Sequence, residues 1–127
     1  MKVLAIDDEP DILRVVKKLV ERKGHECTAA SDGTHGLELL TSEHYDLVLL
    51  DLKMPKMNGF DVLRMLAYGG QLYEKRVVIL SALTLTNKEK EQMKGAGVTE
   101  ILSKPFTPES IERFLGLIAF PTVADKE

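Results

Sequence analysis

The chain has 127 residues, with 17 Lys and Arg against 20 Asp and Glu, and therefore carries a net charge of −3 near neutral pH. This length is typical of one domain that buries a core without disulfides or a structural metal. The weakly acidic balance argues against direct binding of this segment to nucleic acid or to an anionic membrane. The single cysteine, Cys27, lies in an apolar run and is expected to be a small core residue. Neither a charged-then-apolar leader nor a long apolar stretch is present, so we expect a soluble, cytoplasmic protein.

Short apolar runs with strand character alternate along the chain with segments of helical periodicity. Residues 3–6 predict the first strand, and the helix after it carries apolar residues at helical spacing, namely Ile12, Val15, Val16, Leu19 and Val20. Pro10 fits the first turn of this helix, and Gly24 lies just past its end. A weaker strand is predicted at residues 27–30, and the helix after it carries Leu37, Leu39 and Leu40.

Residues 47–50 predict a central strand, because a run that is apolar at every position suits a strand covered by helices on both faces. Residues 57–59 then turn the chain into a third helix, whose apolar side carries Phe60, Leu63 and Leu66. Gly69 and Gly70 are expected to end this helix. A fourth strand is predicted at residues 77–80.

The last two predicted helices differ in how much apolar surface they can bury. Residues 87–94 are nearly all charged or amide and offer only Met93 and Ala96 for burial, so we expect a loosely packed fourth helix that moves easily. After a strand at residues 101–102, Thr107 and Pro108 predict the start of a fifth helix with a buried stripe of Ile111, Phe114, Leu115 and Ile118. Strands and helices in alternation predict an α/β protein with a parallel sheet and helices on both faces.

Four of the predicted strands end at polar residues of different kinds. These residues are Asp7 with Asp8, then Asp51, Ser81 and, just beyond the last strand, Lys104. The carboxyl ends of parallel strands lie along one edge of the sheet, where ligands bind, so these side chains are expected to share one pocket. Three carboxylates, a hydroxyl and an ammonium can hold a divalent cation, supply a carboxylate nucleophile and neutralise a phosphoryl group.

Each of these residues also has a simpler structural explanation when it is taken alone. Asp7 and Asp8 could cap the first helix, and Asp51 could be a turn residue. Ser81 could be a loop hydroxyl and Lys104 a solvated lysine. Their joint occurrence favours a phosphoryl-transfer site, because unrelated caps and turn residues have no reason to assemble a metal and phosphoryl site at one edge.

The whole pattern resembles the receiver domain of two-component response regulators over residues 2–118. The matching stretches are VLAIDDEP at residues 3–10, DLVLLDLKMP at 46–55, MNG at 57–59, LSA at 80–82 and KPF at 104–106. The resemblance implies a flavodoxin-like, doubly wound sheet of five parallel strands in the order 2-1-3-4-5, with five helices on its two faces. It also implies a receiver domain over residues 1–119, like a single-domain chemotaxis regulator, with residues 120–127 as a tail or the start of a linker.

The resemblance further implies a role for each polar residue. Asp51 would be the phosphoacceptor, while Lys104 and Ser81 would contact phosphoryl oxygens. The ligands of Mg²⁺, for which Mn²⁺ can substitute, would be Asp7, Asp8, Asp51 and the backbone carbonyl of Lys53. The peptide bond before Pro105 would be cis. Ile101 stands where most receivers carry a switching Tyr or Phe, so an aromatic switch is not expected here.

The function implied is a phosphorylation-controlled signalling switch rather than an enzyme, although such a domain contributes to its own phosphotransfer and autodephosphorylation. The phosphoryl group would come from a sensor histidine kinase or a histidine phosphotransfer protein. The output surface, on the fourth helix, fifth strand and fifth helix, would act on an effector protein or effector domain that the sequence does not identify. Whether the natural gene ends after Glu127 or continues into such a domain is left open.

Two other classes fit parts of the pattern. A Mg²⁺-dependent phosphatase of the haloacid dehalogenase type would carry a second Asp two residues after the nucleophile, where this chain has Lys53. A flavin-binding protein of the same fold would want a Gly/Ser/Thr-rich phosphate loop after the first strand. Asp7, Asp8 and Glu9 would repel a phosphate at that position, so both classes are minor alternatives.

Overall fold

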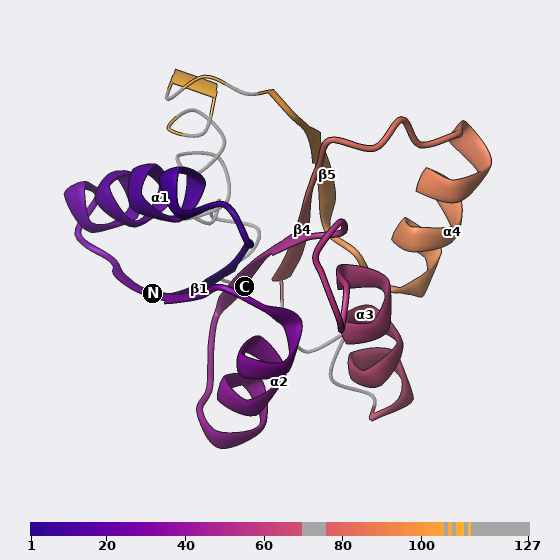
Figure 1. The fold of residues 1–127 in the computed structure, drawn as a ribbon, viewed down its shortest axis with the longest axis horizontal. Helices are drawn as coiled ribbons and strands as arrows, with labels where there is room; N and C mark the ends of the chain where they lie inside the picture. The colour runs from indigo at the N-terminus through magenta and orange to yellow at the C-terminus, as the bar shows by residue number, and fades with distance from the viewer. Residues whose placement is uncertain (70–75, 106, 108, 111, 113–127) are drawn as a thin grey trace, which may run out of the picture.

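The computed structural model describes residues 1–69, 76–105, 107, 109, 110 and 112. Five parallel strands form one sheet in the order β2-β1-β3-β4-β5, which confirms the predicted strand order (Figure 1). The strands are β1 (Lys2–Ile6), β2 (Glu26–Ala30), β3 (Leu47–Asp51), β4 (Arg76–Ser81) and β5 (Glu100–Ser103). The helices of the described residues are α1 (Pro10–Arg22), α2 (Gly33–Ser42), α3 (Gly59–Tyr68) and α4 (Asn87–Ala96). Most of the predicted fifth helix and the whole of residues 120–127 lie outside the described residues.

The three middle strands are the most deeply buried part of the sheet. Every residue of β3 is buried, and β1 and β4 each have only their first residue partly exposed. The two edge strands, β2 and β5, keep several positions partly or fully exposed. The uninterrupted apolar run at residues 47–50 therefore forms the central strand that the sequence predicts.

The register of the sheet brings the polar strand ends to one level. Ile6 pairs with Leu50, and Asp51, one residue further, pairs with Leu80. Ser81 pairs with Ser103 of β5, and Lys104 follows directly. One residue of a strand advances the chain by about 3.3 Å, so the polar side chains at these ends leave the sheet within about one step of each other.

Helices cover both faces of the sheet (Figure 1). On one face, α1 packs Val16, Leu19 and Val20 against the strands, together with the buried Cys27. The opposite face is covered by α2 and α3, with part of α4 beside them. Val15, which was expected in the buried stripe of α1, is 37% exposed, because the stripe is centred on residues 16, 19 and 20. Every helix of the described ranges is too short or too polar to cross a membrane.

The α4 helix has no buried residue, which confirms the predicted thin apolar face. Met93 is partly buried against the core, whereas Ala96 is exposed, so the expectation that Ala96 would be buried is wrong. The two ends of α4 are held by specific capping interactions, although its side chains pack only weakly against the core. Thr86 and Glu89 form a reciprocal capping box at the start, and Gly97 takes the left-handed conformation, φ 120°, that ends the helix.

Candidate functional site

Three acidic side chains come together at the carboxyl ends of β1 and β3. Asp7 directly follows β1, and Asp51 is the last residue of β3. One carboxylate oxygen each from Asp7, Asp8 and Asp51 lies within 4.8 Å of the other two. Asp7 and Asp51 are only 1% and 2% exposed, while Asp8 faces solvent. Buried carboxylates need partners, so this cluster is a site rather than a set of surface charges.

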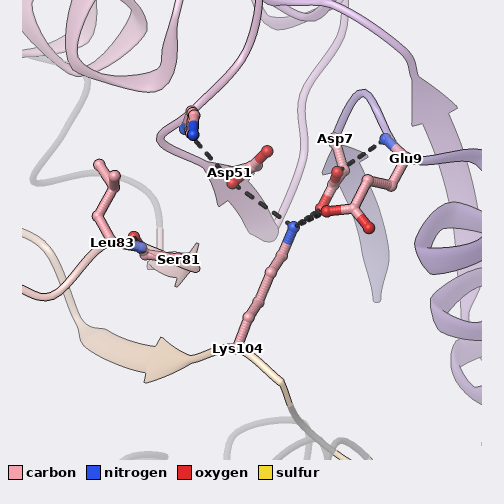
Figure 2. A network of polar contacts seen from close by, with 7 residues as sticks. Asp7, Glu9, Asp51, Ser81, Leu83 and Lys104 are labelled. Carbon is pink, nitrogen blue, oxygen red and sulfur yellow. Dashed lines mark hydrogen bonds and ion pairs between the residues drawn. The ribbon is translucent and has the colours of Figure 1, made fainter.

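Lys104 places its ammonium group among these carboxylates (Figure 2). Its Nζ donates to Asp7 Oδ2 at 2.8 Å and to Glu9 Oε1 at 3.0 Å, and lies 3.6 Å from Asp51 Oδ1. The Lys104 side chain is 8% exposed, so it is not the solvated lysine of the simpler explanation. The peptide bond between Lys104 and Pro105 is cis, as the resemblance implies.

Glu9 is a further residue of the site, and its contact with Lys104 was not predicted from the sequence. The only signal was that Glu9 is the third acid in the run of residues 7–9. It is the N-cap residue of α1, and its backbone N–H donates to Asp7 Oδ1 at 2.9 Å. No side-chain hydrogen bond caps α1, so the alternative that Asp7 or Asp8 serves as its cap is wrong.

Asp51 combines a turn contact with its place in the cluster. Its Oδ1 accepts a long hydrogen bond, 3.4 Å, from the backbone N–H of Lys53, as a turn aspartate does. On the other side of the strand end, the first residue of α3 packs tightly against the Asp51 backbone. A Cβ atom on Gly59 would overlap the carbonyl oxygen of Asp51, so only glycine allows this approach.

Ser81 is buried at the end of β4, next in sequence to the residue that pairs with Asp51. It is 2% exposed, which rules out the loop hydroxyl of the simpler explanation. Its Oγ accepts a hydrogen bond from the backbone N–H of Leu83 at 3.0 Å. A hydroxyl that accepts one bond still has its own hydrogen to donate. Ser81 thus links the site to the loop that leads into α4 (Figure 2).

Burial and mutual repulsion oppose ionisation of the clustered acids. Burial, followed by the charge of Asp7, raises the pKa of Asp51 to about 6, although Lys104 and the Lys53 N–H act in the opposite direction. Burial also raises the pKa of Asp7 in spite of its hydrogen bond with Lys104. Burial disfavours the ammonium of Lys104, but its hydrogen bonds to Asp7 and Glu9 outweigh this and raise its pKa. Lys104 is therefore charged at neutral pH.

The donor set of the cluster fits Mg²⁺. This ion prefers oxygen ligands in an octahedron, in which neighbouring oxygens are about 2.9 Å apart and opposite ones about 4.1 Å. The three carboxylate oxygens lie within 4.8 Å of one another, so they are near enough to bind one ion directly or through its water ligands. Two of the three acids border a pocket of about 510 Å³, which is lined by Asp8, Glu9, Asp51, Lys53, Met54, Pro55, Ala82 and Lys104. A pocket of this size leaves room for water ligands and for a phosphoryl group.

The fold and the site together define a class of protein: a doubly wound α/β domain with an acidic pocket at the carboxyl ends of its central strands. The family model for the response regulator receiver domain matches residues 3–115. The chain therefore belongs to the receiver family of two-component response regulators. This membership confirms the main interpretation of the sequence, and neither the phosphatase class nor the flavin-binding class is the family that matches.

Curated relatives and solved structures agree with this assignment. ResD of Bacillus subtilis is 32% identical over 112 residues, which cover 87% of this chain and 44% of ResD. CpxR of Escherichia coli is 34% identical over 112 residues, which cover 87% of this chain and 45% of CpxR. The chain thus spans less than half the length of these two transcriptional regulators.

Among solved structures, the receiver domain of the Francisella response regulator 1452 superposes with a TM-score of 0.80 at 30% identity, over 91% of this chain and 93% of that one. The chemotaxis response regulator CheY4 of Vibrio cholerae gives a TM-score of 0.78 at 33% identity, over 91% of this chain and 95% of that one. The chain is accordingly similar in fold both to a receiver domain of a response regulator and to a chemotaxis regulator.

Proposed function

We propose that the domain accepts a phosphoryl group on Asp51 and thereby switches a protein-binding surface. The observation that carries this proposal is the position of the Asp51 carboxylate. It ends a fully buried strand, lies within 4.8 Å of Asp7 and Asp8, and has the Lys104 ammonium 3.6 Å away. The proposed nucleophile, the two further acids proposed for a cation and the ammonium proposed for phosphoryl oxygens therefore lie close together at one edge of the sheet.

In the proposed reaction, a carboxylate oxygen of Asp51 forms a bond to the phosphorus of a phosphohistidine, and the bond from phosphorus to the imidazole nitrogen breaks. The donor is a sensor histidine kinase or a histidine phosphotransfer protein. Lys104 supplies a point charge to one phosphoryl oxygen, a role that suits a compact ammonium. Ser81 donates its hydroxyl hydrogen to another oxygen. The pKa of Asp51, about 6, keeps most of the nucleophile ionised near pH 7.5 even without a cation.

Mg²⁺, with Mn²⁺ as a substitute, is the proposed cofactor, and Asp7, Asp8, Asp51 and the backbone carbonyl of Lys53 are its proposed protein ligands. When bound, the cation would neutralise the crowded carboxylates and the incoming phosphoryl charge. The raised pKa values of Asp7 and Asp51 support this, because both acids are buried in a site where their ionised forms are disfavoured. The proposal places the protein in the cytoplasm, in keeping with its single, buried cysteine.

The proposed output surface includes α4 and β5. Ser81 and Lys104 stand at either end of the chain segment that contains α4. If both move toward a phosphoryl group on Asp51, the weakly packed α4 is the element that yields most easily. The partner is an effector protein or an effector domain. The domain itself is proposed to cover residues 1–119, with residues 120–127 as a tail or the start of a linker.

The proposal is tested by incubation with acetyl phosphate, followed by intact mass measurement. We expect an adduct of one phosphoryl group in the presence of Mg²⁺ and little or none in chelator. Asp51→Asn keeps the shape of the side chain but removes the attacking anion, so it should fold normally and accept no phosphoryl group.

Glu38→Gln is the matched control, because Glu38 is an exposed carboxylate on α2 outside the acidic pocket. It should be phosphorylated as the unchanged protein is. Equal phosphorylation with and without Mg²⁺ would contradict the metal assignment. A hydroxylamine-sensitive adduct that persists in Asp51→Asn would show that another carboxylate is the acceptor.

A further inference from the structure

Glu9 contacts Lys104 without belonging to the acidic cluster of Asp7, Asp8 and Asp51. Its backbone is fixed by the hydrogen bond to Asp7 Oδ1, at the point where the chain enters α1. Its side chain is 57% exposed, lines the acidic pocket and accepts a hydrogen bond from Lys104 Nζ at 3.0 Å. The backbone of Glu9 is thus fixed, while its side chain is partly in solvent and partly in contact with Lys104.

The hydrogen bonds of Lys104 are directed away from Asp51. An ammonium group has three hydrogens to donate. Two of them are used by Asp7 at 2.8 Å and by Glu9 at 3.0 Å. The 3.6 Å between Nζ and Asp51 Oδ1 is longer than a normal N–H···O bond. Figure 2 shows Asp51 on one side of Nζ and Glu9 with Asp7 on the other, so Lys104 is held toward the start of α1.

We propose that Glu9 is a positioning residue that holds Lys104 in a resting position and competes for it with the phosphoryl group on Asp51. This inference rests on the proposed function, because it assumes that Lys104 contacts a phosphoryl group. A cation bound at the acidic cluster would neutralise much of the negative charge of Asp7. Glu9, which is partly in solvent and outside the cluster, would then be the anion that still draws Lys104 away from the reacting group.

Removal of the Glu9 charge should therefore favour the phosphorylated arrangement. The probe is fluoroberyllate, a tetrahedral mimic of the phosphoryl group, titrated into the protein at saturating Mg²⁺ and followed by backbone amide signals. The ion pair of Glu9 with Lys104 is only modestly stabilising, because Glu9 is partly exposed. We therefore expect Glu9→Gln to bind the mimic about threefold to tenfold more tightly. Glu9→Asp keeps the charge on a shorter side chain, so its affinity for fluoroberyllate should lie between those of the unchanged protein and Glu9→Gln.

Asp11→Asn is the matched control for charge. It removes one carboxylate in the first turn of α1, but Asp11 pairs with Arg14 and points its 88% exposed side chain into solvent. We expect this variant to bind fluoroberyllate within about twofold of the unchanged protein, because a charge that lies in solvent and does not contact Lys104 is strongly screened. The side-chain Nζ resonance of Lys104 gives a second readout in the metal-free protein. It should shift in Glu9→Gln and stay in place in Asp11→Asn.

A third comparison uses a Lys104→Met background. The tighter binding caused by Glu9→Gln should disappear there, because Glu9 acts through Lys104. Equal gains in Glu9→Gln and Asp11→Asn, a gain that persists without Lys104, or unchanged or weaker binding in Glu9→Gln would each overturn the positioning role while leaving the proposed function intact. Failure of the unchanged protein to bind fluoroberyllate in Mg²⁺ would overturn both.

Discussion

Replacement of Asp51 by asparagine should stabilise the metal-free domain above neutral pH. Asp51 has a pKa of about 6 in the folded protein against 3.8 for the free side chain. Its folded pKa is higher than its unfolded pKa, so ionisation favours the unfolded state. Stability is therefore lost as the pH rises from about 4 to about 6, and the full cost is present above that range.

The size of the effect follows from the pKa difference. A shift from 3.8 to about 6 is about 2.2 pH units, and at 1.36 kcal/mol per unit it gives an upper limit of about 3 kcal/mol. The pKa of about 6 already includes the attraction of Lys104, which lies 3.6 Å from Asp51 Oδ1 and lowers that pKa. We expect Asp51→Asn to raise the free energy of unfolding by about 1–3 kcal/mol at pH 7.5 and by much less near pH 4.

Urea denaturation in chelator, followed by circular dichroism because the chain has no tryptophan, measures this difference at each pH. Asp46→Asn is a control of opposite sign. Asp46 accepts the Lys2 backbone N–H at 2.8 Å, and this bond lowers its pKa. The stability that Asp46 contributes is present above the pKa of Asp46 in the unfolded chain and is lost as the pH falls. Asp46→Asn should therefore destabilise the domain at neutral pH. An Asp51→Asn variant that is no more stable at pH 7.5 than at pH 4, relative to the unchanged protein, would refute the reasoning.

Four further substitutions test the packing around the site. Gly59→Ala should cost about 2 kcal/mol or more in urea unfolding, because its Cβ overlaps the backbone carbonyl of Asp51. Ser81→Ala should weaken fluoroberyllate binding roughly tenfold by titration, since it removes the proposed hydrogen bond to a charged group. Met93→Ala should speed amide hydrogen exchange in α4 and leave β3 unchanged, because Met93 is its partly buried contact with the core. Ile101→Ala should cost about 1 kcal/mol in unfolding, less than a fully buried residue would, because Ile101 is only partly buried. It should keep the fluoroberyllate-induced amide shifts between β4 and β5, and their loss would contradict a switch without an aromatic residue.

The strands were predictable from the sequence because of their hydrophobic pattern, whereas their order in the sheet was predicted from the resemblance to the receiver family. A run that is apolar at every position, as at residues 47–50, must be buried on both faces, and the structure buries all of β3. The polar ends of the strands were predictable for the same reason. Once the strands are parallel, Asp7 and Asp51 have to emerge at the same edge.

Contacts that depend on the direction of a side chain were harder to predict from the sequence. The helical spacing of residues 12–20 does not say where the centre of the buried stripe lies, so Val15 was expected inside and is 37% exposed. The pairing of Glu9 with Lys104 joins residues 95 positions apart in the sequence. No local pattern encodes such a pair, because it depends on how the loop after β1 directs one flexible side chain across the pocket.

The strand β3 is fully buried, whereas the helix α4 has no buried residue, and this difference affects which parts of the domain can change in sequence. Nearly every substitution in β3 disturbs the core, so the strand that carries Asp51 has little freedom to vary. The surface of α4 can exchange one charge pattern for another at small cost in folding energy, because few of its side chains pack against anything. If α4 is part of the output surface, as proposed, new partner specificity can arise there while the proposed chemistry of the pocket is inherited unchanged. A deep mutational scan scored for folding should show this as an intolerant β3 beside a permissive α4.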